Sequence, residues 1–367
     1  MIKSIFFTGG HHNSSLEVAK AIRKKGYRIL WLGHKHTIRG EKSLSYEFLE
    51  VQKSGFDFIE LKTGKFYNPS TLIEWLRIPL GFFQAYKLLK KEKAKMVVAF
   101  GGYLSSPVVL AAYFLGIPSV CHEQTTSAGL ANRLNAVFCR KIFITWPESY
   151  KYFPIAKTLC VGLPMRKSTA KNTNLPVFDF SNGLPTILIA GGKQGSHAIN
   201  LTVGKIYHEL LEKYNIIHQT GGLKQTNDYN KLSHKKASLP ENLQGRLYIR
   251  KYLFQDEMNR ALKQANILIS RAGAHIVYEC LSIGKPVLYI PLRLSLTKEQ
   301  YKNAIKAKSL GTAEILQEES LRPNTLMLKI EEIFQNLESL VQNGLRVKKT
   351  MKKDATSVIV AEIEKLL

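Results

Sequence analysis

The sequence predicts an α/β fold of two doubly wound, Rossmann-like domains that face each other across a cleft. Short apolar runs bounded by turn residues alternate with longer amphipathic stretches, which is the pattern of βαβ units and parallel sheets. The alternation stops once, near the middle of the chain, and then restarts. The length of 367 residues fits two domains at roughly 100–200 residues each.

The elements of the first half are short apolar strands. We expect strands at residues 2–7, 27–32, 96–100, 119–121, 141–145 and 158–161. The pattern then pauses in Gly162-Leu163-Pro164, a polar stretch at 167–174, and a second turn-rich stretch at 181–185. This composition marks the domain boundary, with a linker at 165–185.

The second half repeats the same alternation. We expect strands at residues 186–190, 216–219, 246–249, 267–270, 286–290 and 313–316. Helical patterns separate them at residues 197–211, 255–264, 274–283 and 298–309. The tail from 323 to 367 has the pattern of two or three helices without another strand.

The formal charge of +25 is the most unusual property of the composition. A surplus of this size indicates a polyanionic partner, namely nucleic acid, an anionic membrane surface or a phosphorylated substrate. Hydrophobic residues at 45% and charged residues at 22% exclude a disordered chain and a small disulfide scaffold. The four cysteines form no C-x-x-C pair, and no His cluster has metal spacing, so we expect reduced core thiols and no metal site.

Two apolar stretches are considered as membrane segments, and neither is expected to insert into a bilayer. The apolar run at residues 1–7 is too short for a signal peptide. The charge-free stretch 96–121 is long enough to span a bilayer at about 20 residues. Gly, Ser and Pro residues interrupt it, so we expect strand, loop, helix and strand there, and no transmembrane span.

Three Gly-rich loops follow predicted strands. They are Thr8-Gly9-Gly10-His11, Gly101-Gly102-Tyr103 and Gly191-Gly192-Lys193-Gln194-Gly195. Gly-rich loops at the carboxyl ends of parallel strands allow phosphate to approach the backbone and a helix N-terminus. Each Gly pair alone is equally compatible with a tight structural turn, and none contains a P-loop or dinucleotide fingerprint. Three such loops at equivalent strand ends favour ligand binding.

The histidines of the first half suggest general base chemistry. His11 lies in the first loop, and histidine is suited to proton abstraction near neutral pH. The alternative is a histidine that caps the following helix. His122-Glu123-Gln124 places three polar groups at a strand end, where a structural polar network is the alternative.

The second half contains a candidate nucleotide site. Ser270-Arg271-Ala272-Gly273-Ala274-His275 runs from a strand into a helix, and Glu279 lies further along that helix. A carboxylate there suits a ribose diol, while loop amides hold a diphosphate; the alternative is an acidic residue that only complements the helix dipole. Gln300 and Asn303 share a helix face and suit sugar hydroxyls, or are solvated surface amides.

Residues 72–95 combine apolar and basic side chains. Such a pattern fits a helix on an anionic interface, and a core helix with a basic exposed face is the alternative. The global charge favours the interface. The candidate membrane residues are Leu72, Trp75, Leu76, Ile78, Leu80, Phe82, Phe83, Lys87 and Lys90.

Taken together and in order, these motifs resemble the MurG family of N-acetylglucosaminyltransferases. Further matching segments are Ala128-Gly129-Leu130-Ala131-Asn132, His218-Gln219-Thr220-Gly221 and Gln300-Tyr301-Lys302-Asn303-Ala304. The resemblance implies a GT-B fold with an acceptor and membrane-associating domain at 1–164 and a UDP-sugar domain at 186–345. A final helix at 346–367 would return toward the first domain.

The resemblance also implies the reaction. GlcNAc would pass from UDP-GlcNAc to the 4-hydroxyl of undecaprenyl-diphospho-MurNAc-pentapeptide (lipid I), with inversion, to give lipid II in peptidoglycan synthesis. No cofactor or metal would be required. The expected partners are UDP-GlcNAc, the lipid-linked acceptor and an anionic membrane surface, without nucleic acid, at the cytoplasmic face of the cell membrane.

The resemblance assigns the site residues as follows. His11 and Glu123 are the catalytic candidates, and acceptor binding falls to His11, Tyr103, His122, Gln124 and Asn132. Donor binding falls to Thr8, Gly9, Gly10, Thr125, Arg166, Gly191, Gly192, Lys193, Gln194, Gly195, Gln255, Arg271, Gly273, Ala274, His275, Ile276, Val277, Tyr278, Glu279, Gln300 and Asn303.

Several positions depart from the family pattern. Thr125 stands where the family has Asn, Lys193 and Ala272 each replace a Ser, and Glu299 replaces a Gln. Phe6-Phe7 replaces a Gly pair, and the His and Asp expected before residue 298 are absent. These changes bear on the substrate more than on the fold.

The departures keep three other functions open. A related GT-B transferase with another lipid acceptor would be distinguished by an acceptor panel. A non-hydrolysing UDP-GlcNAc epimerase would convert the donor without an acceptor. A degenerate, non-catalytic membrane- or nucleic-acid-binding protein would bind polyanions in a salt-sensitive way without affinity for the nucleotide sugar.

Overall fold

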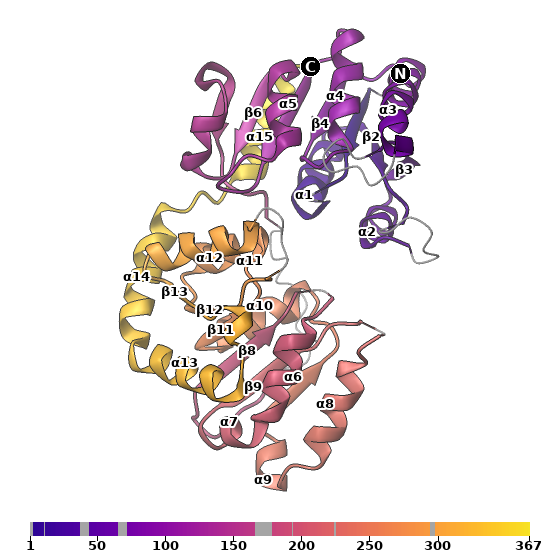
Figure 1. Ribbon diagram of the computed structural model, residues 1–367. Coiled ribbons are helices and arrows are strands. Elements are labelled where there is room, and N and C mark those ends of the chain that lie inside the picture. Colours follow the sequence, from indigo (N-terminus) through magenta and orange to yellow (C-terminus); the bar gives the residue numbers. More distant parts are fainter. Residues whose placement is uncertain are drawn as a thin grey trace. The chain divides into compact units, whose positions relative to one another are not determined.

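The computed structural model describes residues 3–10, 12–36, 44–64, 72–165, 178–192, 194–223, 225–293 and 298–367, with the backbone alone described at 72–76 and 255. The chain forms two compact units, of which the first is Met1–Arg166 with Lys352–Leu367 and the second is Lys167–Met351 (Figure 1). His11, Arg166 and Lys193 lie outside the described residues.

The described part of the first unit is built on a seven-stranded parallel sheet in the order β3-β2-β1-β4-β5-β6-β7. The order reverses between β1 and β4, as in a doubly wound fold. The strands are β1 (Ser4–Thr8), β2 (Arg28–Gly33), β3 (Asp57–Glu60), β4 (Met96–Ala99), β5 (Ser119–Glu123), β6 (Lys141–Ile144) and β7 (Thr158–Cys160). The edge strand β3 was missed because only two of its four residues are apolar.

Helices cover both faces of this sheet, so its strands are buried on both sides. Phe6 packs with Leu30 on one face, and Phe7 stacks on Trp31 on the other, with ring centroids 5.9 Å apart. Such double burial explains the continuous apolar runs in the sequence. The helices are α1 (His12–Arg23), α2 (Tyr46–Lys53), α3 (Leu72–Lys91), α4 (Ser105–Phe114), α5 (Leu130–Phe138) and the 3₁₀ turns η1 (Pro147–Tyr152) and η2 (Ile155–Lys157).

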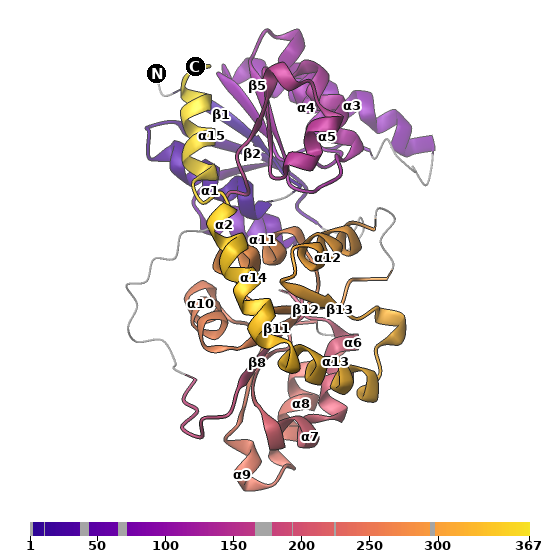
Figure 2. The same ribbon diagram turned by 90° about the vertical axis from the view of Figure 1, so that its left-hand side faces the viewer.

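The last helix of the chain, α15 (Ala355–Glu364), belongs to the first unit. It packs beside α1 (Figure 2). Ile359 and Ile363 are fully buried in the same cluster as Ile5, and Glu362 forms an ion pair with Lys141. Residues from the two ends of the chain therefore share one core.

The described part of the second unit has a six-stranded parallel sheet in the order β10-β9-β8-β11-β12-β13, which again reverses beside its first strand. The strands are β8 (Thr186–Ala190), β9 (Asn215–Gln219), β10 (Leu247–Arg250), β11 (Ile267–Ser270), β12 (Val287–Tyr289) and β13 (Ala313–Ile315). All six were predicted, with ends that differ by a residue or less. The apolar residues of β8, β9 and β11 are almost completely buried, which makes them the centre of the core.

The helices of the second unit follow its strands in the expected places. They are α6 (His197–Lys205), α7 (Tyr207–Lys213), α8 (Asp228–Ala237), α9 (Glu241–Gln244), α10 (Gln255–Gln264), α11 (Ala274–Ile283), α12 (Glu299–Ser309), η3 (Glu318–Ser320), α13 (Pro323–Gln335) and α14 (Leu337–Thr350). The single helix expected at 197–211 is interrupted at Ile206, which leaves helical geometry.

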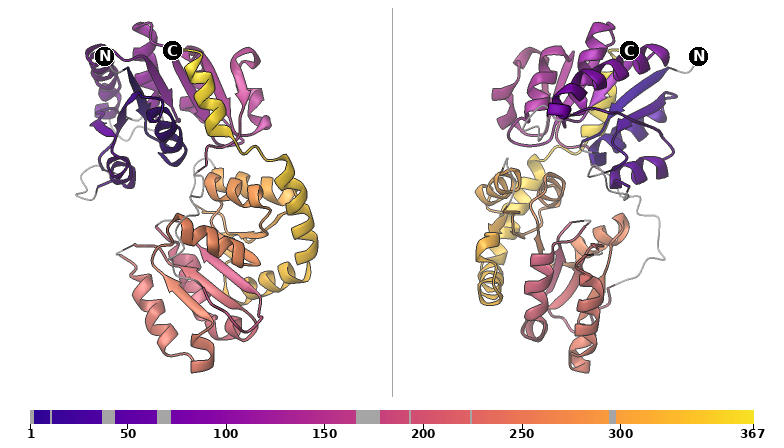
Figure 3. Two further views of the ribbon diagram at one scale, coloured as in Figure 1. Left: turned by 180° about the vertical axis from the view of Figure 1, so that it is seen from behind. Right: turned by 45° about the vertical axis from the view of Figure 1, so that its right-hand side comes forward.

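Helix α14 follows α13 and packs against α11 (Figure 3). It continues past residue 345, where we placed the end of the second domain. Gly284 ends α11 with a positive φ, and a Cβ on Gly344 would lie 2.5 Å from the Gly284 carbonyl oxygen. Glycine at both positions permits this close contact.

The two doubly wound units confirm the predicted fold class. Among the described residues, no helix has both the length and the apolar character that crossing a bilayer requires.

Candidate active site

The loops after β1 and β4 meet at the point where the strand order of the first unit reverses. A Cβ on Gly10 would lie 2.6 Å from the Gly101 carbonyl oxygen, and Gly10, Gly101 and Gly102 all have positive φ. The Gly9 N–H donates to the carbonyl of Leu32. The two Gly-rich loops therefore pack backbone against backbone, which places two of the predicted phosphate loops together in one unit.

A carboxylate that the sequence analysis missed lies under the first loop. Glu47, on α2, accepts a hydrogen bond from the Trp31 indole at 2.7 Å, and its carboxylate occupies the space that a Cβ on Gly9 would need. Burial raises the pKa of the Glu47 carboxyl, while Trp31 opposes that shift. In the sequence, Glu47 is one acidic residue in an ordinary helix, so no local pattern identifies it.

Glu123 ends β5 and is a buried hydrogen-bond acceptor for four donors. Its Oε1 accepts from the Thr125 N–H at 3.0 Å and the Thr125 hydroxyl at 2.9 Å. Its Oε2 accepts from the Gly129 N–H and from Asn132 Nδ2, both at 3.0 Å. The carboxylate therefore organises the loop that leads into α5, which matches the structural alternative considered for this motif.

The other predicted acceptor residues surround this loop. His122 Nε2 lies 3.0 Å from the Gly162 carbonyl oxygen, and the Tyr103 ring lies 5.6 Å from that of His34. Among the described residues, the buried polar atoms Thr8 Oγ1, Asn132 Oδ1 and both amide atoms of Gln124 have no hydrogen-bond partner. Unpaired buried polar atoms are costly, so these atoms are candidates to pair with a bound ligand.

The loops after β8 and β9 form the corresponding pair in the second unit. A Cβ on Gly195 would lie 1.9 Å from the Thr220 carbonyl oxygen, and one on Gly221 would meet the backbone of Gln194. Gln219 Nε2 donates to the Gly192 carbonyl at 2.9 Å. As in the first unit, the predicted Gly loop is held by a neighbouring loop through close backbone contact.

The loop after β11 leads into the N-terminus of α11. Arg271 precedes it, donates to the Ile290 carbonyl at 3.0 Å and forms an ion pair with Glu318. Gly273 is the N-cap and Ala274 the first residue of α11. Burial raises the pKa of Glu279, further along the same helix, to about 7.

The remaining predicted donor residues have different surroundings. His275 and Ile276 are partly exposed, whereas the side chains of Val277 and Tyr278 are buried in the core. Asn303, on α12, is buried and donates to the Ala272 carbonyl at 3.1 Å.

Two of the predicted glutamines complete this set. Gln300 accepts from the Leu292 N–H at 3.0 Å. Gln255 opens α10, but its side chain is outside the description. Among the described residues, no three His, Cys, Asp or Glu side chains are grouped to hold a metal ion.

The α3–α4 patch consists of Leu80, Phe82, Phe83, Tyr113 and Phe114. Leu80, Phe83, Tyr113 and Phe114 are each more than half exposed. Phe82 contacts both Phe83 and Phe114, with ring centroids 5.4 and 5.8 Å away. Leu72, Trp75 and Leu76 fall where only the backbone is described, and Ile78 is partly buried.

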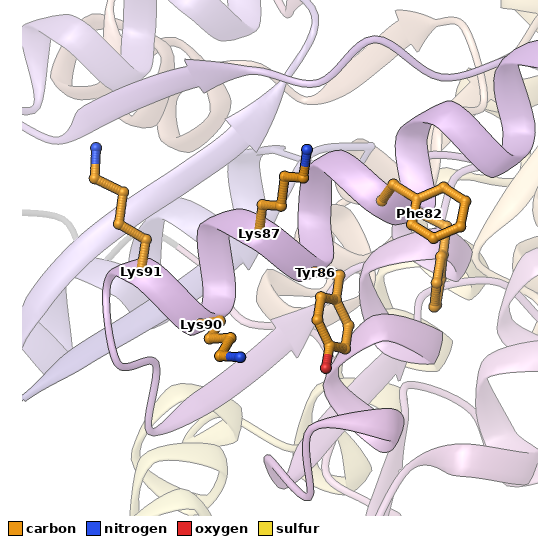
Figure 4. Close-up of a pocket in the computed structure, with 6 residues that line it drawn as sticks. Phe82, Tyr86, Lys87, Lys90 and Lys91 are labelled. Atoms are coloured by element: carbon orange, nitrogen blue, oxygen red, sulfur yellow. The ribbon is translucent and has the colours of Figure 1, made fainter.

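Lysines flank the α3–α4 patch. A groove of about 520 Å³ is lined by Phe82, Phe83, Tyr86, Lys87, Lys90 and Lys91. In Figure 4, Lys87 and Lys91 extend in one direction from α3, and Tyr86 and Lys90 extend to the other side. Apolar side chains with cations on both sides are the features of an interfacial membrane site.

Comparison with known proteins covers both units. Residues 8–144 match the N-terminal domain of glycosyltransferase family 28, and residues 186–359 match its C-terminal domain. A protein of Clostridium kluyveri named UDP-N-acetylglucosamine–N-acetylmuramyl-(pentapeptide) pyrophosphoryl-undecaprenol N-acetylglucosamine transferase is 32% identical over 99% of both chains. The correspondingly named protein of Clostridium tetani is 29% identical over 100% of this chain and 98% of its own.

Solved structures agree with the sequence comparison. The crystal structure of MurG from Acinetobacter baumannii is similar with a TM-score of 0.75 and 25% identity, over 99% of both chains. A UDP-GlcNAc 2-epimerase from Neisseria meningitidis shares the fold, with a TM-score of 0.64 and 17% identity over the full length of both chains.

Proposed function

This chain belongs to glycosyltransferase family 28, and we propose on that premise that it transfers GlcNAc from UDP-GlcNAc to the 4-hydroxyl of the muramoyl sugar of lipid I, giving lipid II. The observation that carries this proposal is the match to transferases of that name over 99% of the chain. The match includes both units, which supports assigning donor binding and acceptor binding to this one chain.

The second unit is proposed to bind the donor. The N-terminus of α11, at Gly273 and Ala274, presents free N–H groups and a positive dipole end to a diphosphate. Glu279 is proposed to accept from ribose hydroxyls, Gln255 to contact the uracil and Gln300 to contact the sugar. Asn303 is proposed to act through its hydrogen bond to the Ala272 carbonyl, which holds the loop that precedes α11.

The first unit is proposed to bind the acceptor and to supply the base. His11 removes the proton of the 4-hydroxyl as its oxygen attacks the anomeric carbon from the face opposite UDP, and the bond to the UDP oxygen breaks with inversion. The helix N-terminus and Arg271 stabilise the departing diphosphate. Since four donors fill the Glu123 carboxylate, we assign it to holding the acceptor loop instead of to proton transfer.

An activity assay tests the proposal directly. Purified protein with UDP-GlcNAc and a lipid I analogue should release UDP and form the disaccharide product, and UDP release should require the acceptor. Without UDP release, under conditions in which a known family member is active, the proposal fails. Transfer to another lipid, such as diacylglycerol, but not to lipid I would instead support a related transferase.

The shared fold of UDP-GlcNAc 2-epimerases supplies the second candidate function. An epimerase would change the configuration of the donor in the absence of any acceptor. Proton exchange or epimer formation in UDP-GlcNAc alone, followed by NMR, would support it.

We also propose that the protein is peripheral on the cytoplasmic face of the membrane and docks through the α3–α4 patch. The exposed aromatic rings bury in the interface, and each nearby lysine adds about 1 kcal/mol of attraction to anionic lipid. The variant Phe83→Asp should lower binding to phosphatidylglycerol vesicles at least tenfold in sedimentation. Leu328→Asp is the matched control, because Leu328 is an equally exposed apolar residue on α13 of the second unit.

A further inference from the structure

A chain of buried hydrogen bonds runs through the second unit toward the start of α6. The Tyr207 hydroxyl lies 2.6 Å from His218 Nδ1, and His218 Nε2 lies 3.0 Å from Asn200 Oδ1. Asn200 Nδ2 is 2.8 Å from Asp228 Oδ2, and Asp228 Oδ1 is 2.8 Å from His197 Nδ1. The chain joins α7, β9, α6 and α8, and none of its five members is used in the proposed reaction.

The direction of each hydrogen bond follows from chemistry. Carbonyl and carboxylate oxygens only accept, so the amide nitrogen of Asn200 must face Asp228 and the Thr220 carbonyl, which lies 2.8 Å away. Asn200 Oδ1 then accepts from His218 Nε2–H. Burial lowers the pKa of His218 to about 3, so this ring is neutral and its Nδ1 accepts from the tyrosine hydroxyl.

The same logic fixes the orientation of His197. Asp228 is held by Asn200, and its second oxygen accepts from His197 Nδ1–H. A ring that donates from Nδ1 to a carboxylate directs Nε2 to its other side. The His197 side chain is 46% exposed, so an interior network orients a ring that reaches the surface.

His197 is the first residue of α6, and Ser196 is its N-cap. A serine at this position usually accepts from a first-turn N–H group, but the Ser196 side chain makes no capping hydrogen bond. Ser196 is 5% exposed, and its Oγ has no hydrogen-bond partner among the described residues. The N-terminus of α6 thus combines a buried, unpaired hydroxyl with an oriented imidazole.

We propose that Ser196 and His197 form a phosphate-binding site at the start of α6, and that Asp228 and Asn200 are its positioning residues. A helix N-terminus with hydroxyl and imidazole donors is complementary to a phosphate oxygen. The proposal rests on the proposed function, in which both substrates carry a diphosphate. The phosphate comes from the nucleotide or from the isoprenyl diphosphate, and the experiment separates these sources.

Calorimetric titration of the full-length protein with UDP, uridine and farnesyl diphosphate tests the site. The variants are His197→Ala and Ser196→Ala, and His208→Ala is the matched control because His208 is an exposed histidine of the same unit on α7. We expect His197→Ala and Ser196→Ala to weaken binding of one diphosphate probe about tenfold, the loss expected for a hydrogen bond to a charged group. Uridine affinity should not change, and His208→Ala should bind all probes like the parent protein.

If the variants lose affinity for UDP alone, the site binds the donor. If they lose affinity for farnesyl diphosphate alone, the site binds the acceptor. Unchanged affinity for both probes in folded His197→Ala and Ser196→Ala overturns the proposal. Asp228→Asn should weaken binding of the same probe as His197→Ala does. The double variant Asp228→Asn/His197→Ala should lose no more affinity for that probe than His197→Ala alone. If the parent protein binds the diphosphate probe through Ser196 and His197 but transfers no GlcNAc, the proposed function is rejected and the phosphate site is still supported.

Discussion

The carboxyl edges of the two sheets satisfy their buried polar groups in different ways. In the first unit, Thr8 Oγ1, Asn132 Oδ1 and the Gln124 amide have no partner among the described residues. At the same edge of the second unit, Asn200 and Asn303 are paired through hydrogen bonds of 2.8–3.1 Å, although Ser196 Oγ is unpaired in the described part of the chain. An unpaired buried polar group costs about 1–3 kcal/mol, so folding alone gives no reason to keep such groups in the first unit.

This difference indicates a division of labour. In the second unit Asn200 and Asn303 are held before substrate arrives, and Ser196 Oγ is a buried hydroxyl at this edge that is left for a ligand. Side chains held in this way suit rigid binding of a nucleotide. The first unit leaves Thr8, Asn132 and Gln124 with atoms unpaired within the described residues, which suits the proposed role of this edge in binding and deprotonating the acceptor. Substitutions in the two units should therefore affect different quantities, and four predictions follow from that contrast.

The largest effect is expected for the proposed base in the first unit. His11→Asn should lower kcat by roughly 10²–10⁴ while the Kd for UDP stays within about twofold, because the base acts on the acceptor. Steady-state kinetics and UDP titration measure the two quantities. The adjacent His12 is the control: it pairs with Glu50 at 3.0 Å, and His12→Asn should change kcat far less. Equal losses for both histidines would remove His11 from this role.

The next effect concerns the stability of the first unit. Glu123→Ala removes the acceptor of four buried hydrogen bonds, and unpaired donors cost about 1–3 kcal/mol each, so the free energy of unfolding should fall by at least about 3 kcal/mol. Urea denaturation measures it. Glu364→Ala removes an exposed ion pair to Lys25 and should cost no more than about 1 kcal/mol. A mild effect of Glu123→Ala would show that the loop does not depend on this carboxylate.

A pH-dependent effect is expected in the second unit. Because burial raises the pKa of Glu279 to about 7, the folded state keeps a proton that the unfolded chain loses above its ordinary pKa of 4.5. The ionisation of this carboxyl therefore takes no stability from the fold below about pH 4.5, takes more as the pH rises, and takes about 3 kcal/mol above pH 7.

Glu279→Gln should consequently stabilise the unliganded protein at pH 8 and not near pH 4.5, while weakening UDP-GlcNAc binding. Urea denaturation at the two pH values, with Glu338→Gln as an exposed control on α14, measures the first part. Equal stabilisation at both pH values would show that the ionisation of Glu279 is not responsible.

The smallest effect compares two buried threonines. Thr8→Val replaces a hydroxyl without a partner, so it should leave the free energy of unfolding unchanged or higher. Thr312→Val removes a hydrogen bond to the Ala307 carbonyl at 3.0 Å and should cost about 1 kcal/mol. Thermal denaturation distinguishes them, and a larger loss for Thr8→Val would contradict the contrast between the units.

The sequence predicted the fold well because parallel strands buried on both faces form continuous apolar runs. All six strands of the second unit were predicted, and β3 was missed because an edge strand needs fewer apolar residues. The domain boundary expected at residue 345 falls inside α14, which continues to Thr350 within the second unit.

The site was predictable only where a residue type carried a motif. Gly9, Gly10, Gly191 and Gly195 were identified from the Gly-rich motifs. In the structure, each has a neighbour so close that a side chain would not fit, and Gly10 and Gly195 also have a positive φ. Glu47 and Asp228 did not stand out, because their roles depend on partners far away in the sequence, such as Trp31 and His197. Polar networks of this kind become visible only in three dimensions.

The position of α15 has a consequence for the order in which the chain is synthesised. Residues 3–165 are synthesised before residues 355–364, so until α15 is made their core lacks Ile359 and Ile363. The second unit is one continuous segment and can complete its core while the first still exposes apolar residues on the face that α15 covers. The first unit is thus begun before the second unit and completed after it, and a chain truncated before residue 355 would leave that face uncovered.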